Sequence, residues 1–191
     1  MKIKSDENGY LEGQILIAMP TMSDPRFQKT IILLCSHTKD GAMGIVLNRN
    51  LNILSFEDLL EQLDISVTQN SKNQSIHFGG PVETERGFVL HSTDMVHETS
   101  IMVGDGIALT ATLDMLQSMA DGTGPDESFF ALGYSGWGPG QLEQEIQDNG
   151  WLVVDADSHL VFGQALEDKW QAAIGKLGFD PGLLSSDHGH A

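Results

Sequence analysis

Four glycines and a proline surround Tyr134, Ser135 and Trp137 in the segment GYSGWGPG, residues 133–140. Glycines two residues before and two residues after a serine are typical of the nucleophile elbow of serine hydrolases, where a strained turn exposes the hydroxyl group. Gly133 has the first of these positions, but Trp137 occupies the second. A bulky indole there would crowd the turn. The sequence therefore disfavours a serine hydrolase, and the segment also lacks the spacing of the common nucleotide-binding motifs.

The glycine segment leads into a predicted helix, and this arrangement could bind an anion. Pro139 suits the first turn of a helix, and the backbone N–H groups of residues 138–141 would lack partners within that helix. Such N–H groups hold anions well. In the alternative interpretation, the glycines only let the preceding strand, predicted at 127–134, pass closely into the helix while Trp137 covers the edge of the core.

Two other positions place scarce cations beside predicted turns. Asn48 and Arg49 end a predicted strand, and Arg86 follows the Gly-Gly-Pro turn at residues 79–81. An arginine beside the N–H groups of a turn could hold a carboxylate, a phosphate or an acidic side chain of a partner. Alternatively, each arginine pairs with a neighbouring carboxylate on the surface. The residue types alone are compatible with both interpretations.

The seven histidines do not have the spacing of a metal site. His91 and His97 are six residues apart, and neither the HxxxH nor the HExxH helical spacing occurs. His188 and His190 lie near the C-terminus, where solvation is the simpler explanation. Acidic pairs suited to general acid–base catalysis are too numerous to single one out. The sequence therefore predicts no catalytic residues, no metal site and no cofactor.

The charge balance argues against nucleic acid as a partner. The chain has 27 acidic and 10 basic side chains, which gives a formal net charge of −17 at pH 7. Nucleic-acid binding draws much of its affinity from Lys and Arg that neutralise phosphates, and the basic residues of this chain are scattered. Solubility alone explains such acidity more simply than a dedicated basic partner does. Direct DNA binding is therefore disfavoured.

The length of 191 residues suits one domain, predicted over 1–180 and followed by a frayed tail at 181–191. The single cysteine, Cys35, lies in an apolar run and is expected to be a buried, inert thiol. This cysteine usage is typical of the reducing cytoplasm. No apolar run approaches the length of a membrane span or a secretory signal, so we expect a cytoplasmic protein that does not contact a membrane.

Apolar runs bounded by turn residues predict strands, and apolar residues at helical spacing predict four helices. Asp40-Gly41 and the residues 104–106 supply the turns of two hairpins. Hairpins combined with separated helices predict an α+β domain with a mixed, mainly antiparallel sheet. The polar segment 64–75 is predicted to be a mobile loop. Strands are expected at 14–19, 30–37, 43–49, 76–78, 87–92, 99–103, 106–110, 127–134, 151–156 and 159–163, and helices at 55–63, 112–120, 139–148 and 165–177.

Four groups of segments together resemble the YqgE/AlgH family: GQILIAMPTMSDPRFQKTIILL, GIVLNR, FGGPV with GFVLHS, and ALGYSGWGPGQLEQEI. The resemblance covers nearly the whole chain in order. The family is bacterial, largely uncharacterised and once labelled transcriptional regulators, and it supplies no established catalytic residues. It implies that the sheet curls into a partly open barrel packed by several helices. Together with the arginine argument, its motif positions imply a ligand or partner cleft formed by Asn48, Arg49, Gly79, Gly80, Pro81, Arg86, Tyr134, Gly136, Trp137, Gly138, Gly140 and Gln141.

These observations favour a non-enzymatic cytoplasmic regulatory or interaction protein that binds a partner or a small ligand in this cleft. The alternative is an enzyme or metabolite-binding protein for a small anion, held by residues 138–141 and by Arg49 or Arg86. Direct regulation of transcription through DNA is the least favoured hypothesis, because the net charge opposes it. A regulatory role would therefore be indirect.

Overall fold

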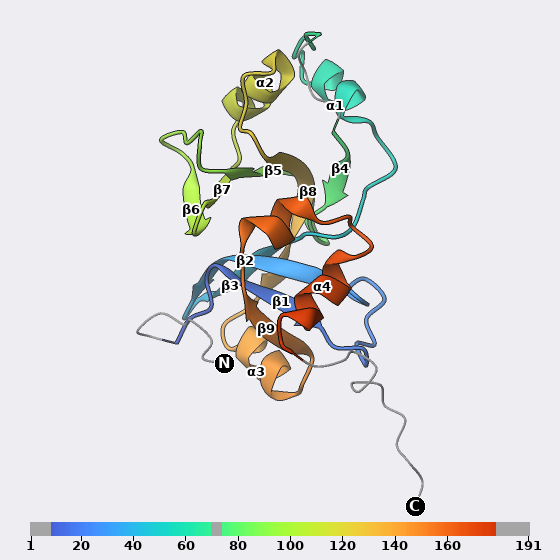
Figure 1. Cartoon of the computed structure of the whole chain (residues 1–191), viewed down its shortest axis with the longest axis vertical. Helices are drawn as coiled ribbons and strands as arrows, with labels where there is room; N and C mark the ends of the chain where they lie inside the picture. Colours follow the sequence, from blue (N-terminus) through green and yellow to red (C-terminus); the bar gives the residue numbers. More distant parts are fainter. Residues whose placement is uncertain (1–8, 70–73, 179–191) are drawn as a thin grey trace, which may run out of the picture.

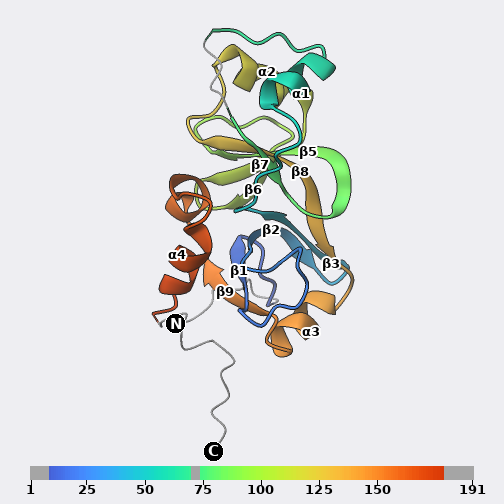
Figure 2. The same ribbon diagram turned by 90° about the vertical axis from the view of Figure 1, so that its right-hand side faces the viewer.

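The computed structural model describes residues 9–69 and 74–178, which form one curled sheet with helices around it (Figures 1 and 2). The strands and helices alternate irregularly along the chain. The strands are β1 Gln14–Ala18, β2 Ile31–Thr38, β3 Gly41–Val46, β4 Ile76–Phe78, β5 Val82–Ser92, β6 Ile101–Gly104, β7 Ile107–Thr110, β8 Ser128–Trp137 and β9 Trp151–Asp155. The helices are α1 Phe56–Gln62, α2 Leu113–Asp121, α3 Gln141–Gln147, the π-helix η1 His159–Gly163, and α4 Lys169–Gly175.

The nine strands form a mixed, mainly antiparallel sheet, and the predicted fold class is confirmed. The strand order is β6-β7-β5-β8-β3-β2-β1-β9, with antiparallel neighbours throughout, while β4 pairs in parallel with β8. The sheet curls into a half-barrel, so that β6 also contacts β2 across its interior. A Cβ atom on Gly13 would lie 2.4 Å from the carbonyl oxygen of Val103, so the end of β6 lies directly against the chain that leads into β1.

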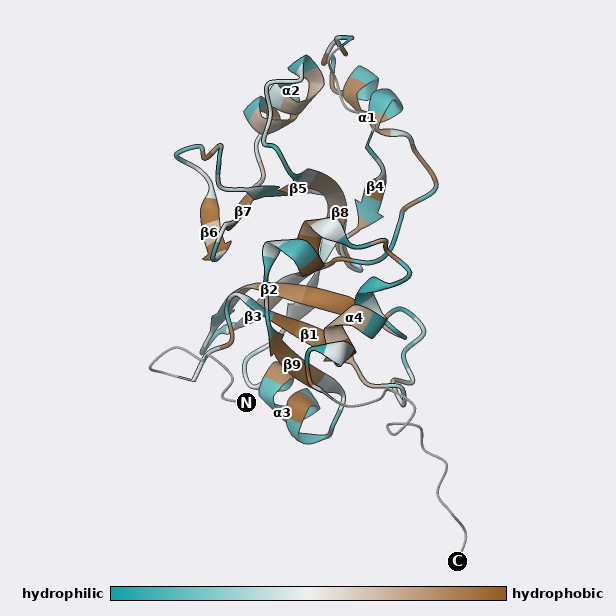
Figure 3. Cartoon of the chain, in the orientation of Figure 1, coloured by the Kyte–Doolittle hydropathy of each residue, from teal (hydrophilic) through white to brown (hydrophobic). Residues whose placement is uncertain are grey.

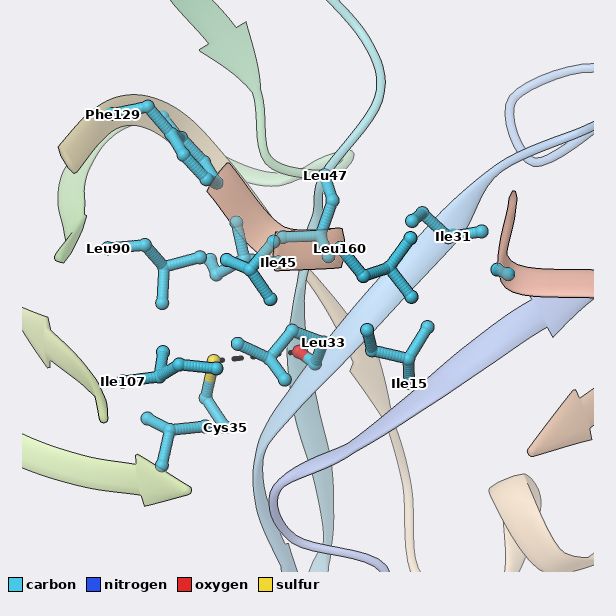
Figure 4. Close-up of a cluster of buried hydrophobic side chains, with 14 of the residues drawn as sticks. Ile15, Ile31, Leu33, Cys35, Ile45, Leu47, Leu90, Ile107, Phe129 and Leu160 are labelled. Atoms are coloured by element: carbon cyan, nitrogen blue, oxygen red, sulfur yellow. Dashed lines mark hydrogen bonds between the residues drawn. The ribbon is translucent and has the colours of Figure 1, made fainter. Parts of the chain in front are cut away.

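Apolar side chains from the inner face fill the half-barrel. Alternate residues of β1, β2 and β3 point inward, among them Ile15, Leu33 and Ile45, all fully buried (Figure 4). Strands β1, β2 and β9 are accordingly coloured as strongly hydrophobic in Figure 3. The period-two alternation of a strand places such residues on one face of the sheet, and removing them from water is the main source of stability.

The helices cover the sheet in three places, two on its outer face and one on its inner side. The pair α1 and α2 packs over β4, β5 and β8 through a cluster that includes Leu60, Met115 and Phe130. Helix α3 covers the outer face of β1, β3 and β9 through Leu142. Helix α4 packs against β1 and β2 and buries Ile174 in the interior cluster. None of the helices in the described part of the chain is both long and apolar enough to cross a membrane.

The predicted helices at 55–63 and 112–120 and the two predicted hairpins are found in the structure, because each depends on short-range chemistry. Ser55 accepts the N–H group of Asp58, whose carboxylate accepts the N–H group of Ser55, which forms a capping box at the start of α1. Gly122 ends α2 in the left-handed conformation. The hairpins β2–β3 and β6–β7 are antiparallel, as their turn residues predicted.

Two predictions for the last part of the sequence are wrong. Residues 159–163, expected to form a strand, form the π-helix η1, and the helix expected from residue 165 begins at Lys169. A five-residue apolar run fits a buried helix turn as well as a strand, since length and burial do not distinguish them. The Lys169 ammonium donates to the carbonyl groups of Leu160 and Val161, which stabilises the wide turn.

The glycine segment is also more extended than predicted. Strand β8 continues through Trp137 instead of ending near Tyr134, so only residues 138–140 form the turn before α3. Ser135 pairs with Gly44 of β3 and is buried in the sheet. Its hydroxyl group is therefore not displayed on a turn, contrary to what a nucleophile elbow requires.

The predicted mobile loop 64–75 lies only partly within the described residues. Ile65 is buried, and both the backbone N–H and the hydroxyl group of Thr68 donate to the carbonyl oxygen of Ala120 at the end of α2. Residues 70–73 of this segment and the predicted tail 181–191 lie outside the described residues. The contacts at Ile65 and Thr68 attach the first part of the segment to α2.

Cys35 lies inside the half-barrel and is expected to be unreactive in the folded protein (Figure 4). Its side chain is 2% exposed, and burial raises the pKa of the thiol to about 12. At neutral pH, only about one molecule in 10⁵ would then carry the reactive thiolate. We expect 5,5′-dithiobis(2-nitrobenzoate) to label Cys35 at the unfolding rate in buffer and immediately in guanidinium chloride. Rapid labelling of the native protein would contradict this expectation.

Candidate functional site

The open end of the half-barrel contains a cavity of about 630 Å³, which we call the end cavity. Six strands supply its lining, and their register explains why they meet here. Ala42 pairs with Trp137, Val82 pairs with Tyr134, and Leu109 pairs with Ile101. These pairs bring the same end of β2, β3, β5, β6, β7 and β8 together. The lining consists of Ser36, Thr38, Asp40, Gly41, Ala42, Met43, Val82, Arg86, Phe88, Thr99, Ile101, Leu109, Ala111, Tyr134, Gly136 and Trp137.

Aromatic and apolar side chains make up most of the inner wall of the end cavity. The rings of Phe88 and Tyr134 meet edge to face, with centroids 6.0 Å apart and an interplanar angle of 81°. Gly136 leaves room beside this pair, because a Cβ atom there would lie 3.3 Å from Cε2 of Tyr134. Met43 and Leu109 complete the apolar surface. The cavity therefore suits an apolar group more than a fully polar molecule.

Arg86 is the cationic side chain of the end cavity. Its Nη1 atom lies 3.0 Å from the Glu83 carboxylate, and its guanidinium carbon lies 5.2 Å from the centre of the Phe88 ring. Both partners of the ion pair are more than half exposed, so the pair contributes at most about 1 kcal/mol. An incoming anion could therefore replace Glu83 at little cost, and Asp40 adds a negative charge to the lining.

Four of the residues predicted to form the cleft line the end cavity, namely Arg86, Tyr134, Gly136 and Trp137. Gly79 and Gly80 lie just behind it, where the chain after β4 crosses β8. A Cβ atom on Gly79 would lie 2.2 Å from the carbonyl oxygen of Gly133, and one on Gly80 would lie 2.1 Å from the carbonyl carbon of Tyr134. These glycines, followed by Pro81, allow the two backbones to touch and thereby position Tyr134.

Asn48 and Arg49 lie beyond the other end of β3 and do not line the end cavity. The Asn48 side chain accepts from the N–H group of Ile31 at 3.0 Å and donates to the carbonyl oxygen of Lys29 at 2.8 Å. Arg49 donates to the carbonyl oxygen of Gln28 at 2.7 Å. Both side chains therefore fasten the loop before β2, and the residues predicted to form one cleft are divided between two ends of the sheet.

The remaining predicted residues, Gly138, Gly140 and Gln141, begin α3. The N–H group of Gly138 donates to the side-chain oxygen of Gln141 at 3.0 Å, and Gly140 adopts a left-handed conformation with φ of 72°. The Gln141 amide in turn donates to Glu145 at 2.8 Å. The Gln141 side chain thus accepts one N–H group just before α3, while Arg49 donates to Gln28 and Arg86 pairs with Glu83.

Glu145 connects α3 to the two tryptophans at the edge of the sheet. Its Oε2 atom accepts the indole N–H groups of Trp137 and Trp151 at 2.9 and 2.8 Å. The two indoles meet edge to face, with ring centroids 6.0 Å apart. The predicted alternative for Trp137, that it covers the edge of the core, describes this packing, although Trp137 also belongs to the lining of the end cavity.

Sequence reasoning missed most of the apolar wall of the end cavity. Met43, Phe88, Ile101 and Leu109 lie on predicted strands, and their alternation indicates only that they face one side of a sheet. Among the residues that the structure describes, no three His, Cys, Asp or Glu side chains are grouped to hold a metal ion.

Known proteins identify the family of this chain. The AlgH-like family (DUF179) matches residues 15–182. A UPF0301 protein of Rhodospirillum rubrum is 54% identical over 183 residues, covering 96% of this chain and 95% of the relative. A UPF0301 protein of Nitrobacter hamburgensis is 50% identical over 193 residues, covering 97% and 89%.

Two solved structures are also similar. The solution structure of the AlgH protein of Pseudomonas aeruginosa covers all of both chains with 41% identity and a TM-score of 0.79. A crystal structure from Corynebacterium diphtheriae has 19% identity and a TM-score of 0.75 over 97% of this chain and 95% of the other, and it supports the fold alone. The family match, the relatives and the similar fold all point to the same family. The chain belongs to the AlgH-like family.

Proposed function

We propose that this protein is a non-enzymatic cytoplasmic binding protein, and that the end cavity binds a small, mainly apolar ligand with one carboxylate. The cavity itself carries the proposal: about 630 Å³ of space, walled by Phe88, Tyr134 and Met43, opens beside the Arg86 guanidinium. Cavities of about 300–1,000 Å³ with apolar walls and a few polar groups are typical ligand sites.

The preformed walls of the end cavity and the charge of Arg86 support a binding role. Strands hold its walls, so little conformational entropy is lost when a ligand enters a cavity that is already formed. Arg86 supplies one charge, which could orient a carboxylate at the rim and leave the apolar part of the ligand against Phe88 and Tyr134. Ser135, the residue with the position of a nucleophile, is buried within the sheet, which favours binding over hydrolysis.

Regulation, the role once given to the family that the sequence resembles, would then depend on the bound ligand. The net charge of −17 opposes the approach of this protein to DNA, so an effect on transcription would pass through another protein. A ligand that occupies the end cavity would change the surface formed by β6, where Ile101 and Met102 are exposed.

Octanoate and octanol, measured by isothermal titration calorimetry, test this proposal. Both should bind to the end cavity, and octanoate should bind more tightly because of Arg86. The variant Arg86→Gln should weaken octanoate binding about tenfold, equivalent to about 1.4 kcal/mol, and leave octanol binding unchanged. Arg26→Gln is the matched control, because Arg26 forms a similar exposed ion pair with Asp24 outside the cavity.

A second variant blocks the end cavity without removing charge. Thr99 is exposed at the rim, so Thr99→Trp should fold and should abolish the binding of both molecules. Failure of both molecules to bind the unmodified protein, or undiminished binding to Thr99→Trp, would overturn the proposal.

A further inference from the structure

A second cavity, of about 360 Å³, lies between the start of β8, the π-helix η1 and the start of α4. We call it the lysine cavity, because Lys169 lies in its wall together with His77 of β4 and Phe129 of β8. It shares no lining residue with the end cavity. Residues of η1 and of the start of α4, which lie one above the other in Figure 2, form part of its lining.

Lys169 is a buried cation without a buried anion. Its side chain is 2% exposed, and no carboxylate of the described residues lies within ion-pair distance of the ammonium. Lysine is almost never fully buried unless it is paired, because removing the ammonium from water is costly. Burial accordingly lowers the pKa of Lys169 to about 8, which leaves the ammonium the main form at neutral pH. The site therefore lacks a compensating negative charge.

The hydrogen bonds of Lys169 leave one donor for a ligand. The ammonium donates to the carbonyl oxygens of Leu160 and Val161 at 2.8 and 2.6 Å. An ammonium has three N–H donors, so these two carbonyl groups satisfy all but one. Because both carbonyl groups belong to η1, the wide turn of the π-helix holds the ammonium at the wall of the cavity. π-Helix turns occur frequently at functional sites.

His77 supplies a second unsatisfied group in the same wall. The side chain is 8% exposed, its ring stacks on Phe129 with centroids 4.3 Å apart, and its Nδ1 atom is buried without a hydrogen-bond partner among the described residues. Burial, followed by the nearby Lys169 ammonium, lowers the pKa of His77 to about 4, so the ring is neutral. Within the described part of the chain, Nδ1 is therefore the ring nitrogen left without a hydrogen bond.

The chemistry of these two groups restricts the ligand. The remaining N–H group of Lys169 suits a negative oxygen atom, and Nδ1 of the neutral His77 ring suits a hydroxyl group, which can donate to it or accept from it. The rim carries Asp126 and Glu127, so a single negative charge is tolerated better than two. We propose that the lysine cavity binds a small hydroxycarboxylate, with its carboxylate on Lys169 and its hydroxyl group on His77.

Lactate is the probe, and two relatives of lactate test the two contacts separately. Propionate lacks the hydroxyl group, and methyl lactate lacks the charge. In titrations followed by nuclear magnetic resonance, lactate should shift the His77 ring signals, propionate should bind roughly fivefold more weakly, and methyl lactate should not bind. Inorganic phosphate that binds more tightly than lactate would overturn the proposed ligand class, as would the absence of lactate binding at about 100 mM, well above the millimolar range of weak complexes.

Two lysine variants test whether Lys169 contacts lactate. Lys169→Met keeps the length of the side chain without its charge and should weaken lactate binding at least tenfold, whereas Lys39→Met, at an exposed lysine far along the chain, should not change it. Unchanged binding to Lys169→Met would contradict the proposal. Because the carbonyl groups of η1 lose their donor in this variant, circular dichroism must first show that it folds.

If Lys169→Met does not fold, the variant Glu127→Gln tests whether lactate binds as an anion in the lysine cavity. Glu127 is exposed on the rim, and no hydrogen bond of its side chain is found in the described part of the chain. Removal of its charge should strengthen lactate binding about two- to threefold at low salt, and equal or weaker binding would overturn the proposal. Thr99→Trp should leave lactate binding intact, which separates this proposal from the one for the end cavity.

Discussion

Replacement of Gly133 by alanine is expected to destabilise the protein by about 4 kcal/mol, a large part of the stability of a typical domain. Gly133 has a φ of 73°, which an alanine adopts only with strain. An added Cβ atom would also lie 2.4 Å from the carbonyl oxygen of Gly80 and 3.0 Å from that of Val82. Both neighbours are backbone atoms, so β8 or the crossing chain would have to move.

Gly140→Ala is the matched control for this prediction. Gly140 has a φ of 72°, nearly the same as Gly133, but an added Cβ atom there would have no neighbour within 4 Å. The free energy of unfolding of this variant should therefore fall only by the cost of placing alanine in the left-handed conformation, about 1 kcal/mol. Urea unfolding of both variants measures the difference. Equal losses would show that the close contact at Gly133 contributes nothing.

Removal of the Glu145 carboxylate is expected to lower the free energy of unfolding by about 3 kcal/mol. Trp137 and Trp151 are 7% and 3% exposed, and both donate their indole N–H groups to Oε2 of Glu145. Glu145→Ala leaves two buried donors without an acceptor, and each unsatisfied donor costs about 1–3 kcal/mol. Urea unfolding measures the loss, and the tryptophan emission of the folded variant should shift to longer wavelength as water reaches the indoles.

Two variants of α3 show whether this loss comes from the acceptor. Glu145→Gln keeps a carbonyl oxygen at the same place, so it should recover at least half of the loss. Gln147→Ala changes an exposed residue of the same helix and should alter stability by at most about 0.5 kcal/mol. If Glu145→Ala were no more destabilising than Gln147→Ala, the two indole hydrogen bonds would not contribute to stability.

The parts of the fold that depend on nearby residues could be predicted from the sequence. The capping box at Ser55, the end of α2 at Gly122 and the hairpin at Asp40-Gly41 each follow from chemistry within a few residues. The π-helix at His159–Gly163 could not, because it depends on Lys169, which reaches its carbonyl groups only after the chain has folded back.

The candidate site was predictable only in part, for a geometric reason. The sequence places Arg86, Tyr134 and Asn48 at the ends of strands, but it does not tell which ends meet once the sheet curls. The register brings Arg86 and Tyr134 together and sends Asn48 to the opposite end of β3. Lys169 and His77 were missed because more than ninety residues separate them in the sequence, and only the folded chain brings them into one wall.

The pairing of β1 with β9 affects the order in which the protein can be completed during synthesis. All five residues of β1 are buried, and each of them pairs with a residue of β9. More than a hundred residues separate the two strands, so the ribosome needs on the order of ten seconds to make β9 after β1. During that interval an apolar strand edge has no permanent partner, and such edges pair readily with other chains. The nascent chain therefore exposes an apolar strand edge until β9 emerges.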